Sequence, residues 1–494
     1  MGEVRRYVAL DLGAESGRAI VGQFDGDHLE LEVIHRFGNG PVAVFDSLHW
    51  DILYLWREIK EGLCRCAGSF PSIDSLGVDA WAQDFGLLGA DDALLGNPHC
   101  YRDPRTDGMI EELLQHVTAD EIYQTTGNPP RYSITTLCQL MSLVKSKSPS
   151  LRMAQTLLNI APLINFWLTG RKVSEATLLI NGQCYNPVEK RWATGLLDKL
   201  GIPTHIFGEI VQPGAVLGPL LPGVAEETGL GPVPVVASAC HDSAAAVVAV
   251  PTRERDYLFL SCGTWSVLGT EIAEPLIRPE GPIAGLGNEG GAQDNVRFTT
   301  NIIGLWLVQE CRRTWAAQGE TYSYDELTQM AAQGNPLLSL VNPNDMRFLP
   351  PGDMPGRVQE FCRETGQPVP ESKQDILRCI LESLALKYRQ GKEAIESALG
   401  RQMNSVHMVG GGIRNRLLCQ FTADAMGLPI LAGPAESTAI GNIIIQAVGL
   451  GHLSSVQEGR ELVRASVPLE TYEPGATGAG RWQEAYDRFQ RLIT

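Results

Sequence analysis

The feature of this chain that most constrains its fold is a pattern of strand, turn and strand that occurs twice. Tyr7–Leu10 is an apolar strand that leads through a glycine- and serine-containing turn into the apolar run Ala19–Phe24. About half a chain later, Tyr257–Leu260 leads through Ser261–Ser266 into Val267–Gly269. Such a repeat predicts a duplicated architecture in which two similar turns face each other.

Length and composition set limits on that architecture and on its partners. A chain of 494 residues is too long for one core, and 44% hydrophobic with 20% charged residues is typical of globular domains. The formal net charge of −17 argues against nucleic acid or an anionic membrane as a general partner, because either would favour a basic face. A phosphorylated small molecule stays possible, since it needs only a local pocket rich in donors.

The cysteines and the amino terminus indicate the compartment. The 11 cysteines are scattered and form no C-x-x-C, so neither a zinc site nor a disulfide framework is indicated. The first residues lack the apolar region of a signal peptide, and no apolar run approaches the ~18 residues that span a bilayer. We therefore expect a cytoplasmic protein with reduced thiols.

The first turn, Asp11 to Arg18, is a candidate phosphate-binding loop. Gly13 and Gly17 allow a tight turn whose backbone N–H groups point inward, as in a nest for phosphate oxygens. The signal is weak alone, because any hairpin can carry glycine and serine. A third strand is predicted at Leu29–Phe37.

Further elements complete the amino-terminal half. The spacing of apolar residues predicts an amphipathic helix around Trp56–Cys66 and a strand at Ile73–Asp79. Met109–Leu200 is rich in helical patterns, and we expect it to be an insertion that covers one side of the first sheet. Tyr101–Arg105 is polar and is predicted to be a loop.

Aromatic residues flank a carboxylate directly after the strand at Ile73–Asp79. Trp81 and Phe85 with Asp84 suit a sugar, because its C–H faces pack on rings while its hydroxyls seek acceptors. The alternative is equally open: Trp81 and Phe85 in the core and Asp84 in a turn.

Near the middle of the chain, a short strand at Val235–Ala237 is followed by a predicted helix, Ala244–Val248. His241, Asp242 and Ser243 stand between them. Asp242 is a candidate general base, because ligands bind at the carboxyl ends of strands in open α/β sheets. The alternative is an ordinary helix N-cap, since Asp or Ser commonly precedes a run of alanines.

The carboxyl-terminal half contains two glycine-rich stretches of different kinds. Gly285–Gly290 matches G-x-G-x-x-G, but no strand leads in and no helix follows, so a dinucleotide fingerprint is rejected. Gly410–Gly412 lies between the strand Val406–Val409 and the helix Arg416–Met426. Three glycines there permit the close approach of a flat or anionic ligand to a helix N-terminus.

Three more helices are predicted in this half. They are Gly304–Trp315, Asp375–Leu399 and Glu436–Val448, of which the second is the longest. Gly441 inside the last of them indicates a packing contact.

Together and in this order, the motifs resemble the FGGY carbohydrate kinases, and among them the members that act on L-rhamnulose, over Val8 to about Gly451. The supporting stretches are Ala9–Arg18, Tyr101–Arg105, His241-Asp242, Ser261–Ser266, Asn288–Gly291, Asn301–Gln309, Asn342–Phe348 and Val409–Asn415. The resemblance implies an α/β fold with two actin-like (ribonuclease H-like) domains that face a central catalytic cleft. The implied domains are 1–243, which binds the sugar and carries a helical insertion at about 109–200, and 244–494, which binds the nucleotide.

The resemblance also implies an activity and the residues that perform it. An ATP-dependent kinase of this kind transfers the γ-phosphoryl group to the 1-hydroxyl of L-rhamnulose, with Mg²⁺. By family analogy Asp242 takes the proton and Asp11 and Asp242 face the metal. Ala82, His241, Asp242, Ser243 and Asn301 would contact the sugar, and Ala14, Glu15, Ser16, Gly17, Arg18, Thr264, Gln309 and Gly411 the nucleotide.

The residue types agree with phosphoryl transfer, which asks mainly for positioning, charge neutralisation and a carboxylate near the nucleophile. No G-x-x-x-x-G-K-[ST] occurs, so backbone N–H groups, hydroxyls and metal would hold the phosphates instead of a P-loop lysine. The expected partners are thus a small ketose and ATP, without nucleic acid or membrane, in a monomer or homodimer.

Two departures and two rival functions stay open. Where the family pattern usually reads Trp-Gly-Val-Asp-Phe, this chain has Ala82 and Gln83 in place of the glycine and the apolar residue. The preferred sugar could therefore be another ketose or polyol, such as L-fuculose or xylulose. A non-catalytic actin-like protein is the rival from another class, but it could lose Asp242 freely, so the presence of Asp242 favours an enzyme.

Overall fold

Two mixed sheets dominate the computed structural model, which describes residues 4–283, 285–475 and 478–493. The six strands of the first sheet are, in spatial order, β13 (Val216–Pro219), β14 (Pro234–Val236), β6 (Ser75–Ala80), β1 (Arg5–Leu12), β2 (Ser16–Phe24) and β3 (Leu29–Gly38). The seven strands of the second are β17 (Gly287–Gly290), β18 (Val296–Ile303), β16 (Trp265–Ile272), β15 (Tyr257–Cys262), β19 (Ser405–Val409), β20 (Ile430–Ala432) and β21 (Glu470–Tyr472).

The two sheets share one topology, which confirms the predicted duplication. In the first, β1, β2 and β3 form an antiparallel meander, and β1 pairs in parallel with β6. In the second, β15, β16 and β18 form the meander, and β15 pairs in parallel with β19. The strands predicted at the start of each half thus occupy matching places in the two sheets.

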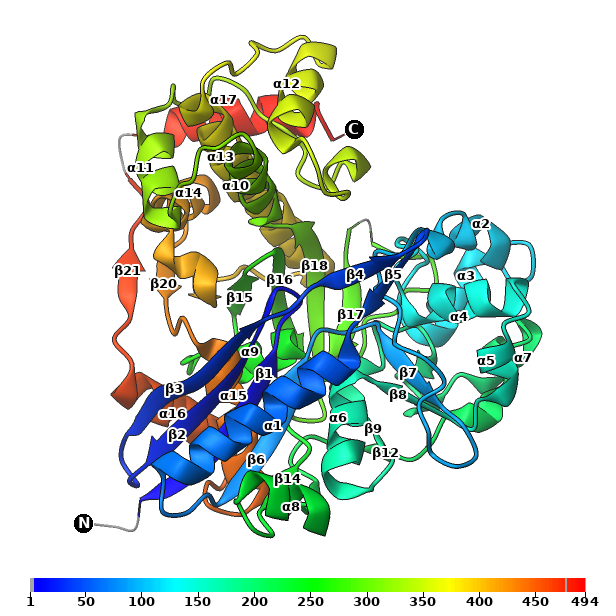
Figure 1. Cartoon of the computed structure of the whole chain (residues 1–494). Coiled ribbons are helices and arrows are strands. Elements are labelled where there is room, and N and C mark those ends of the chain that lie inside the picture. Colours follow the sequence, from blue (N-terminus) through cyan, green and yellow to red (C-terminus); the bar gives the residue numbers. More distant parts are fainter. Residues whose placement is uncertain (1–3, 284, 476–477, 494) are drawn as a thin grey trace.

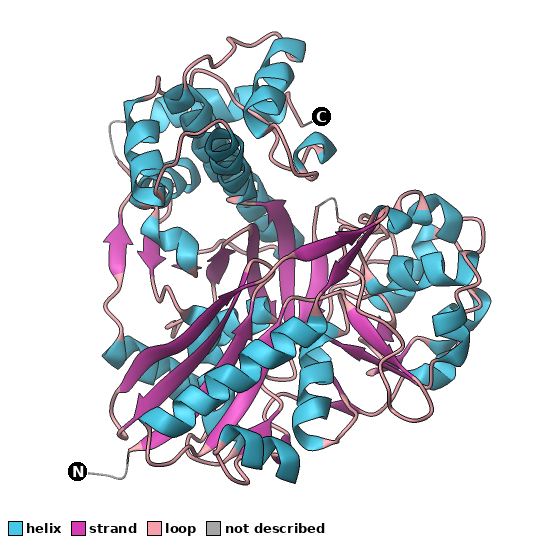
Figure 2. Ribbon diagram, in the orientation of Figure 1, coloured by secondary structure: helices cyan, strands magenta, loops and turns pink. Residues whose placement is uncertain are grey.

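Helices cover both faces of the first sheet, as Figures 1 and 2 show. Strand β1 therefore buries alternate side chains in two cores: Val8 and Leu10 on one face, Tyr7 and Ala9 on the other. Helices α1 (Ile52–Ser69) and α6 (Ile160–Thr169) pack on the first face. Helices α15 (Ser437–Gly449) and α16 (Val456–Ser466), from the carboxyl-terminal half, pack on the second. The two halves of the chain are thus interlocked.

Helix α9 (Asp242–Val248) lies between the two sheets. Ala244 and Ala245 pack in the core of the first sheet, whereas Ala246 and Val247 pack against the second. Small side chains on every face let this short helix fit between them. On α15, a Cβ added at Gly441 would lie 1.8 Å from the Ala245 carbonyl oxygen. The predicted packing role of Gly441 is therefore confirmed.

Helix α13 (Lys373–Leu399), the longest of the described helices, covers the other face of the second sheet and confirms the helix predicted there (Figure 1). Its buried stripe includes Ile376, Ile380 and Leu384. Five further helices pack around it: α10 (Trp306–Ala317), α11 (Tyr324–Gln333), α12 (Met354–Glu364), α14 (Arg416–Met426) and α17 (Ala479–Gln490).

The helical segment predicted at 109–200 is arranged differently from the expectation. Of its helices, α6 packs on the first sheet, but the others form a lobe beside it (Figure 1). They are α2 (Met109–Leu113), α3 (Ala119–Thr126), α4 (Thr136–Lys145), α5 (Pro149–Met153) and α7 (Thr194–Lys199). This lobe has a core of its own, which includes Leu113, Ile122 and Leu137. A self-contained core explains why most of the segment does not need the sheet.

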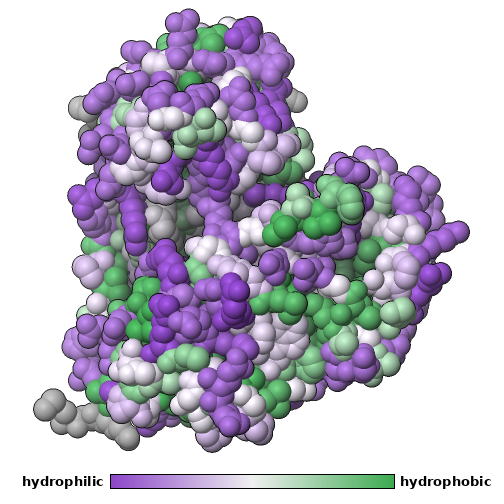
Figure 3. Space-filling model, in the orientation of Figure 1, coloured by the Kyte–Doolittle hydropathy of each residue, from purple (hydrophilic) through white to green (hydrophobic). Residues whose placement is uncertain are grey.

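Short elements complete the fold. The two-stranded sheets pair β4 (Pro41–Val44) with β5 (Ser47–Trp50), β7 (Phe85–Leu88) with β8 (Thr156–Asn159), β9 (Ser174–Glu175) with β12 (Ile210–Val211), and β10 (Tyr185–Asn186) with β11 (Arg191–Trp192). Helix α8 (Pro222–Thr228) lies against α1. The hairpin β4–β5 exposes Val42, Val44 and Phe45, where Figure 3 shows apolar side chains on the surface.

The described residues can be compared with the expectations on membrane spans and cysteines. None of their helices is long and apolar enough to span a bilayer. All 11 cysteines are free, and all but Cys64 are buried.

Candidate active site

A cleft of about 660 Å³ opens between the two halves, and the N-terminus of α9 lies in it. Figure 3 shows the surface hollowed between the part at the top left, which contains α13, and the rest of the molecule. The structure brings almost all of the predicted site residues to this cleft. They are Asp11, Ala14, Glu15, Ser16, Arg18, Ala82, His241, Asp242, Ser243, Thr264, Asn301, Gln309 and Gly411.

Gly17 is the predicted site residue that does not line the cleft. It lies in β2, opposite Phe37 in β3, and an added Cβ would come within 2.2 Å of the Phe37 ring. Its glycine is therefore required by packing within the sheet, since even one methyl group would collide with the aromatic side chain.

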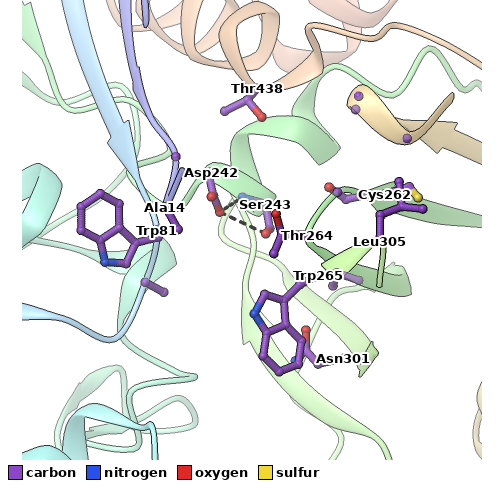
Figure 4. Close-up of a pocket in the computed structure, with 18 of the residues that line it drawn as sticks. Ala14, Trp81, Asp242, Ser243, Cys262, Thr264, Trp265, Asn301, Leu305 and Thr438 are labelled. Carbon is purple, nitrogen blue, oxygen red and sulfur yellow. Dashed lines mark hydrogen bonds between the residues drawn. The ribbon is translucent and has the colours of Figure 1, made fainter. Parts of the chain in front are cut away.

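Asp242 stands in the first turn of α9, directly after the N-cap residue His241. Its Oδ1 accepts hydrogen bonds from the backbone N–H of Ser243 (2.6 Å) and from the Ser243 hydroxyl (3.1 Å). Figure 4 shows it between Trp81 on one side and Thr264 on the other. His241 holds the N-cap position without a side-chain cap hydrogen bond, and Asp242 lines the cleft from the first turn of the helix.

The electrostatic surroundings of Asp242 suit a general base. Burial and the nearby negative charge of Asp11 raise its pKa to about 7. Proton transfer is most efficient when the pKa of the base lies near the working pH. Both causes are geometric, because the strand β1 and the helix α9 bring the two carboxylates to one end of the first sheet.

Asp11, at the end of β1, faces Arg18 across the antiparallel pair with β2. Arg18 forms ion pairs with both Asp11 and Glu436, the residue that precedes α15. Burial raises the pKa of the Asp11 carboxyl, although the ion pair with Arg18 opposes this effect. At the edge of the same turn, Glu15 forms an ion pair with Arg313 of α10. The pairs Arg18–Glu436 and Glu15–Arg313 join the amino-terminal half to the carboxyl-terminal half.

The two turns of the duplicated strand pairs are closed in similar ways. In the first, the N–H of Gly13 donates to the carbonyl of Ser16 (3.0 Å). In the second, the N–H of Gly263 donates to the carbonyl of Trp265 (2.9 Å). Both turns line the cleft, so the predicted arrangement of two facing loops is present.

The triple glycine has a divided role. Added Cβ atoms at Gly410 and Gly412 would meet atoms of Cys262 at 3.1 Å and 2.3 Å, so both glycines let the loop pack against β15. At Gly411 an added Cβ would meet nothing within 4 Å, and this residue lines the cleft. In the same cleft, the Oε1 atom of Gln309 is buried without a hydrogen-bond partner among the described residues. This part of the cleft thus offers an open backbone and an unused acceptor.

The sequence left open whether Trp81 and Asp84 contact a sugar or serve the core and a turn. Trp81 lines the cleft, with its ring centroid 4.2 Å from that of Trp50. Asp84 is fully buried, and its Oδ2 accepts from the indole N–H groups of Trp81 (2.9 Å) and Trp50 (2.5 Å). Its Oδ1 accepts from the amide of Gln139 (2.9 Å). Asp84 therefore orients the tryptophans and does not itself face a ligand.

Four polar side chains form a chain of contacts at the wall of the cleft, which His241, Glu289 and Asn301 line. Arg297, in β18, donates to Nδ1 of His241 (3.0 Å) and lies 3.0 Å from the carboxylate of Glu289. The other oxygen of Glu289 accepts from the side-chain amide of Asn301 (2.8 Å). Burial and the positive charge of Arg297 lower the pKa of His241 to about 3, so the imidazole is neutral.

The sequence reasoning quoted Glu289 only as part of a motif and missed Arg297. The usable signal was weak: a single arginine inside the apolar run Val296–Phe298, eight residues after a glutamate. The pairing becomes visible once β17 and β18 are aligned, because Glu289 and Arg297 are register partners.

Comparison with solved structures identifies the fold. Gluconate kinase from Lactobacillus acidophilus superposes with a TM-score of 0.80 at 17% identity, covering 99% of this chain and 98% of that one. Xylulose kinase from the same organism gives 0.80 at 17% identity, with 99% and 97% covered. Glycerol kinase from Plasmodium falciparum with ADP gives 0.78 at 14%, with 100% and 99% covered. The predicted α/β fold with two actin-like domains is confirmed.

Sequence comparison identifies the family. The profile of the FGGY family of carbohydrate kinases, N-terminal domain, matches residues 6–249, and that of the C-terminal domain matches residues 258–450. A rhamnulokinase of Bacteroides thetaiotaomicron is 42% identical over 489 residues, which cover 99% of both chains. A rhamnulokinase of Oceanobacillus iheyensis is 36% identical over 94% of this chain and 97% of its own. The chain belongs to the FGGY family of carbohydrate kinases.

Proposed function

We propose that this kinase transfers the γ-phosphoryl group of ATP to the 1-hydroxyl of L-rhamnulose, giving L-rhamnulose 1-phosphate and ADP. The observation that carries the proposal is the position of Asp242, on a helix between the two sheets and in a cleft lined by both duplicated turns. The relatives that are 42% and 36% identical over nearly the whole chain carry the name rhamnulokinase, which supports the choice of sugar.

In the proposed reaction, the oxygen of the sugar 1-hydroxyl attacks the γ-phosphorus while Asp242 accepts the hydroxyl proton. The bond between the γ-phosphorus and the oxygen that bridges it to the β-phosphate breaks, and ADP leaves. A carboxylate with a pKa of about 7 can take this proton near neutral pH. Ser243 holds the carboxylate in place through two hydrogen bonds to Oδ1. General-base action of this kind supplies about 10²–10⁴-fold of the rate.

The phosphates would lie between the two turns. The turn 13–16 and Thr264 supply backbone N–H groups and hydroxyls, and Arg18 supplies a positive charge beside Asp11. The base and ribose would lie near Gly411 and the unpaired Oε1 of Gln309, which can accept a hydrogen bond. Phosphoryl transfer depends mainly on such positioning and charge neutralisation.

The residues also fit Mg²⁺ that arrives with ATP. Among the described residues no three His, Cys, Asp or Glu side chains form a metal-binding group. Mg²⁺ does not require such a cage, because it usually keeps several waters and binds one or two carboxylates together with substrate phosphates. Asp11 and Asp242 are close enough for the charge of Asp11 to raise the pKa of Asp242, a repulsion that a divalent cation would relieve. Bound Mg²⁺ would neutralise charge on the transferring phosphoryl group.

Of the two departures from the family pattern, Ala82 bears more on the selectivity of the sugar site than Gln83. The side chain of Gln83 accepts from the N–H of Thr136 (3.2 Å) and donates to the carbonyl of Asn181 (3.3 Å), so it is engaged with the helical lobe. The methyl group of Ala82 is therefore the change that narrows the pocket. One methyl group is typically worth about 1–3 kcal/mol of discrimination, which retunes the preference among similar ketoses but does not change the reaction.

A coupled assay of ADP release over a panel of ketoses and polyols tests the proposal. We expect L-rhamnulose to give the highest kcat/KM, with some activity on ketoses of related stereochemistry. The variant Ala82→Gly serves as the matched control, since it restores the family's usual residue and is expected to change the ranking without abolishing turnover.

Two results would count against the proposal at different levels. If another sugar ranked far above L-rhamnulose, the assignment of the sugar would be wrong while the kinase assignment stood. If no member of the panel stimulated ATP turnover, the alternative of a non-catalytic actin-like protein would have to be considered again.

A further inference from the structure

The contact between Arg297 and His241 fixes which nitrogen of His241 carries its proton. A guanidinium has only donors, so the atom that it contacts at 3.0 Å, Nδ1 of His241, must be an acceptor. The proton of the neutral ring therefore lies on Nε2. That nitrogen is 3.5 Å from Oδ1 of Asp242, and both residues line the cleft. His241 thus presents a donor toward the site of the attacking hydroxyl.

The same guanidinium fixes the amide of Asn301 through Glu289. A carboxylate paired with arginine is ionised and can only accept, so the Asn301 atom at 2.8 Å from it must be the nitrogen Nδ2. The second polar atom of that amide is the carbonyl oxygen Oδ1, which can only accept hydrogen bonds. Asn301 lines the cleft, and Figure 4 shows it beside Trp265.

Further contacts hold this arrangement rigid. The Nε–H of Arg297 donates to the carbonyl of Gly290 (2.8 Å), and the arginine side chain is only 1% exposed. The backbone N–H of His241 donates to the hydroxyl of Thr177 (3.1 Å), which in turn donates to Glu175 (2.5 Å). Both the ring and the backbone of His241 are therefore fixed by buried groups.

We propose that Arg297 is a positioning residue that sets the polar pattern of the sugar site. Through its contacts, His241 Nε2–H is a donor and Asn301 Oδ1 an acceptor toward the ligand. The site then selects a ligand with an accepting oxygen next to the reacting hydroxyl and a donating hydroxyl at Asn301. This inference rests on the proposed function, because it assumes that the sugar binds between these two side chains.

A buried ion pair is weak evidence of a stabilising role alone, since apolar replacements of such pairs often preserve stability. A positioning role makes a separate prediction, namely a loss of sugar affinity without a loss of nucleotide affinity. Arg297 does not line the cleft, so any effect of its loss on the sugar must pass through the residues it holds that do line it, which are His241, Glu289 and Asn301.

The test uses the double variant Arg297→Met/Glu289→Gln, which removes both charges and leaves no unpaired buried carboxylate. Because Glu289 itself lines the cleft, the single variant Glu289→Gln is measured beside it, and the effect of Arg297 is the difference between the two. Its matched control is Arg460→Met/Glu271→Gln. Arg460 is also buried and lies 2.6 Å from the half-buried Glu271, but it donates to the carbonyls of Val247 and Val248 and not to His241.

Kinetics with the best ketose of the panel form the first measurement. We expect the Arg297 double variant to raise the KM for the sugar by up to about tenfold, as for the loss of one neutral hydrogen bond to the sugar, while the KM for ATP stays unchanged. The control should leave both KM values unchanged, even if it lowers the thermal stability. An unchanged sugar KM in the Arg297 variant, or equal effects of both double variants, would overturn the proposal.

The second measurement is the ¹⁵N spectrum of histidine-labelled protein, with the His241 signals assigned from the spectrum of His241→Gln. We expect wild-type His241 to show a protonated Nε2 and an unprotonated Nδ1, and the Arg297 double variant to lose this fixed tautomer. A protonated Nδ1 in the wild type would overturn the proposal, even if the double variant did not fold. This measurement needs no substrate, so it distinguishes a failure of the inference from a failure of the proposed function.

Discussion

Replacing Gly441 by alanine tests how the catalytic carboxylate is held in place. The added Cβ on α15 would lie 1.8 Å from the carbonyl oxygen of Ala245 in α9. Carbonyl oxygens and methyl carbons rarely approach closer than 3.0 Å, so the two helices must separate by more than about 1 Å. The obstacle is backbone, which cannot move aside as the end of a flexible side chain can.

The displacement should reach the active site. Asp242 is three residues before Ala245 in the same short helix, so a shift of α9 moves its carboxylate. A misplacement of about 1 Å can lower the rate about 10²-fold. We expect Gly441→Ala to reduce kcat by about this factor and to lower the free energy of unfolding by about 1–3 kcal/mol, as for an overpacked core.

Gly459→Ala is a matched control on α16. There an added Cβ would meet Cγ2 of the Ile444 side chain at 2.5 Å, so the variant overpacks α15 against a different helix. The two variants are compared by the coupled ADP-release assay and by denaturant unfolding. We expect Gly459→Ala to lose stability and to retain the wild-type kcat. Similar kcat values for both variants would refute the claim that the α9–α15 contact positions Asp242.

The pH profile and the shape of the molecule give two further predictions. Because the pKa of Asp242 is raised to about 7 and only the ionised form accepts a proton, kcat/KM should fall about tenfold per pH unit below that value. Asp11→Asn should move this limb to lower pH, since the Asp11 charge contributes to the raised pKa; a limb at the same pH would contradict that cause. A sugar with a non-hydrolysable ATP analogue should lower the radius of gyration in small-angle scattering, because closure excludes water from the transfer. Identical scattering with and without both ligands would count against closure.

Much of the fold could be predicted because its signals are local. The strands around Tyr7–Leu10 and Tyr257–Leu260 are short apolar runs bounded by turns, and the helix α14 begins and ends at the predicted residues. The duplication was visible because the two turns share glycines and hydroxyls at similar places. The helical lobe was harder, since an amphipathic pattern shows that a face is buried but not against which partner.

The residues of the site also fall into those that the sequence could predict and those that it could not. The place of Asp11 and Asp242 in the cleft could be predicted, because the edge of the sheet where strands end and helices begin is fixed by the topology. The roles of Asp84 and Arg297 could not, because they depend on partners distant in sequence: Trp50 and Gln139 for the first, His241 for the second. The packing of Gly17 against Phe37 in the neighbouring strand could not be predicted for a related reason.

The most direct test of the central claim is the turnover of Asp242→Asn. The asparagine keeps the size of the side chain but cannot accept the proton of the attacking hydroxyl. We predict that sugar-dependent ADP release falls by about 10²–10⁴-fold, while binding of an ATP analogue, measured by calorimetry, stays close to that of the wild type. Near-wild-type turnover in this variant would contradict the account, because Asp242 would then have no part in the chemistry.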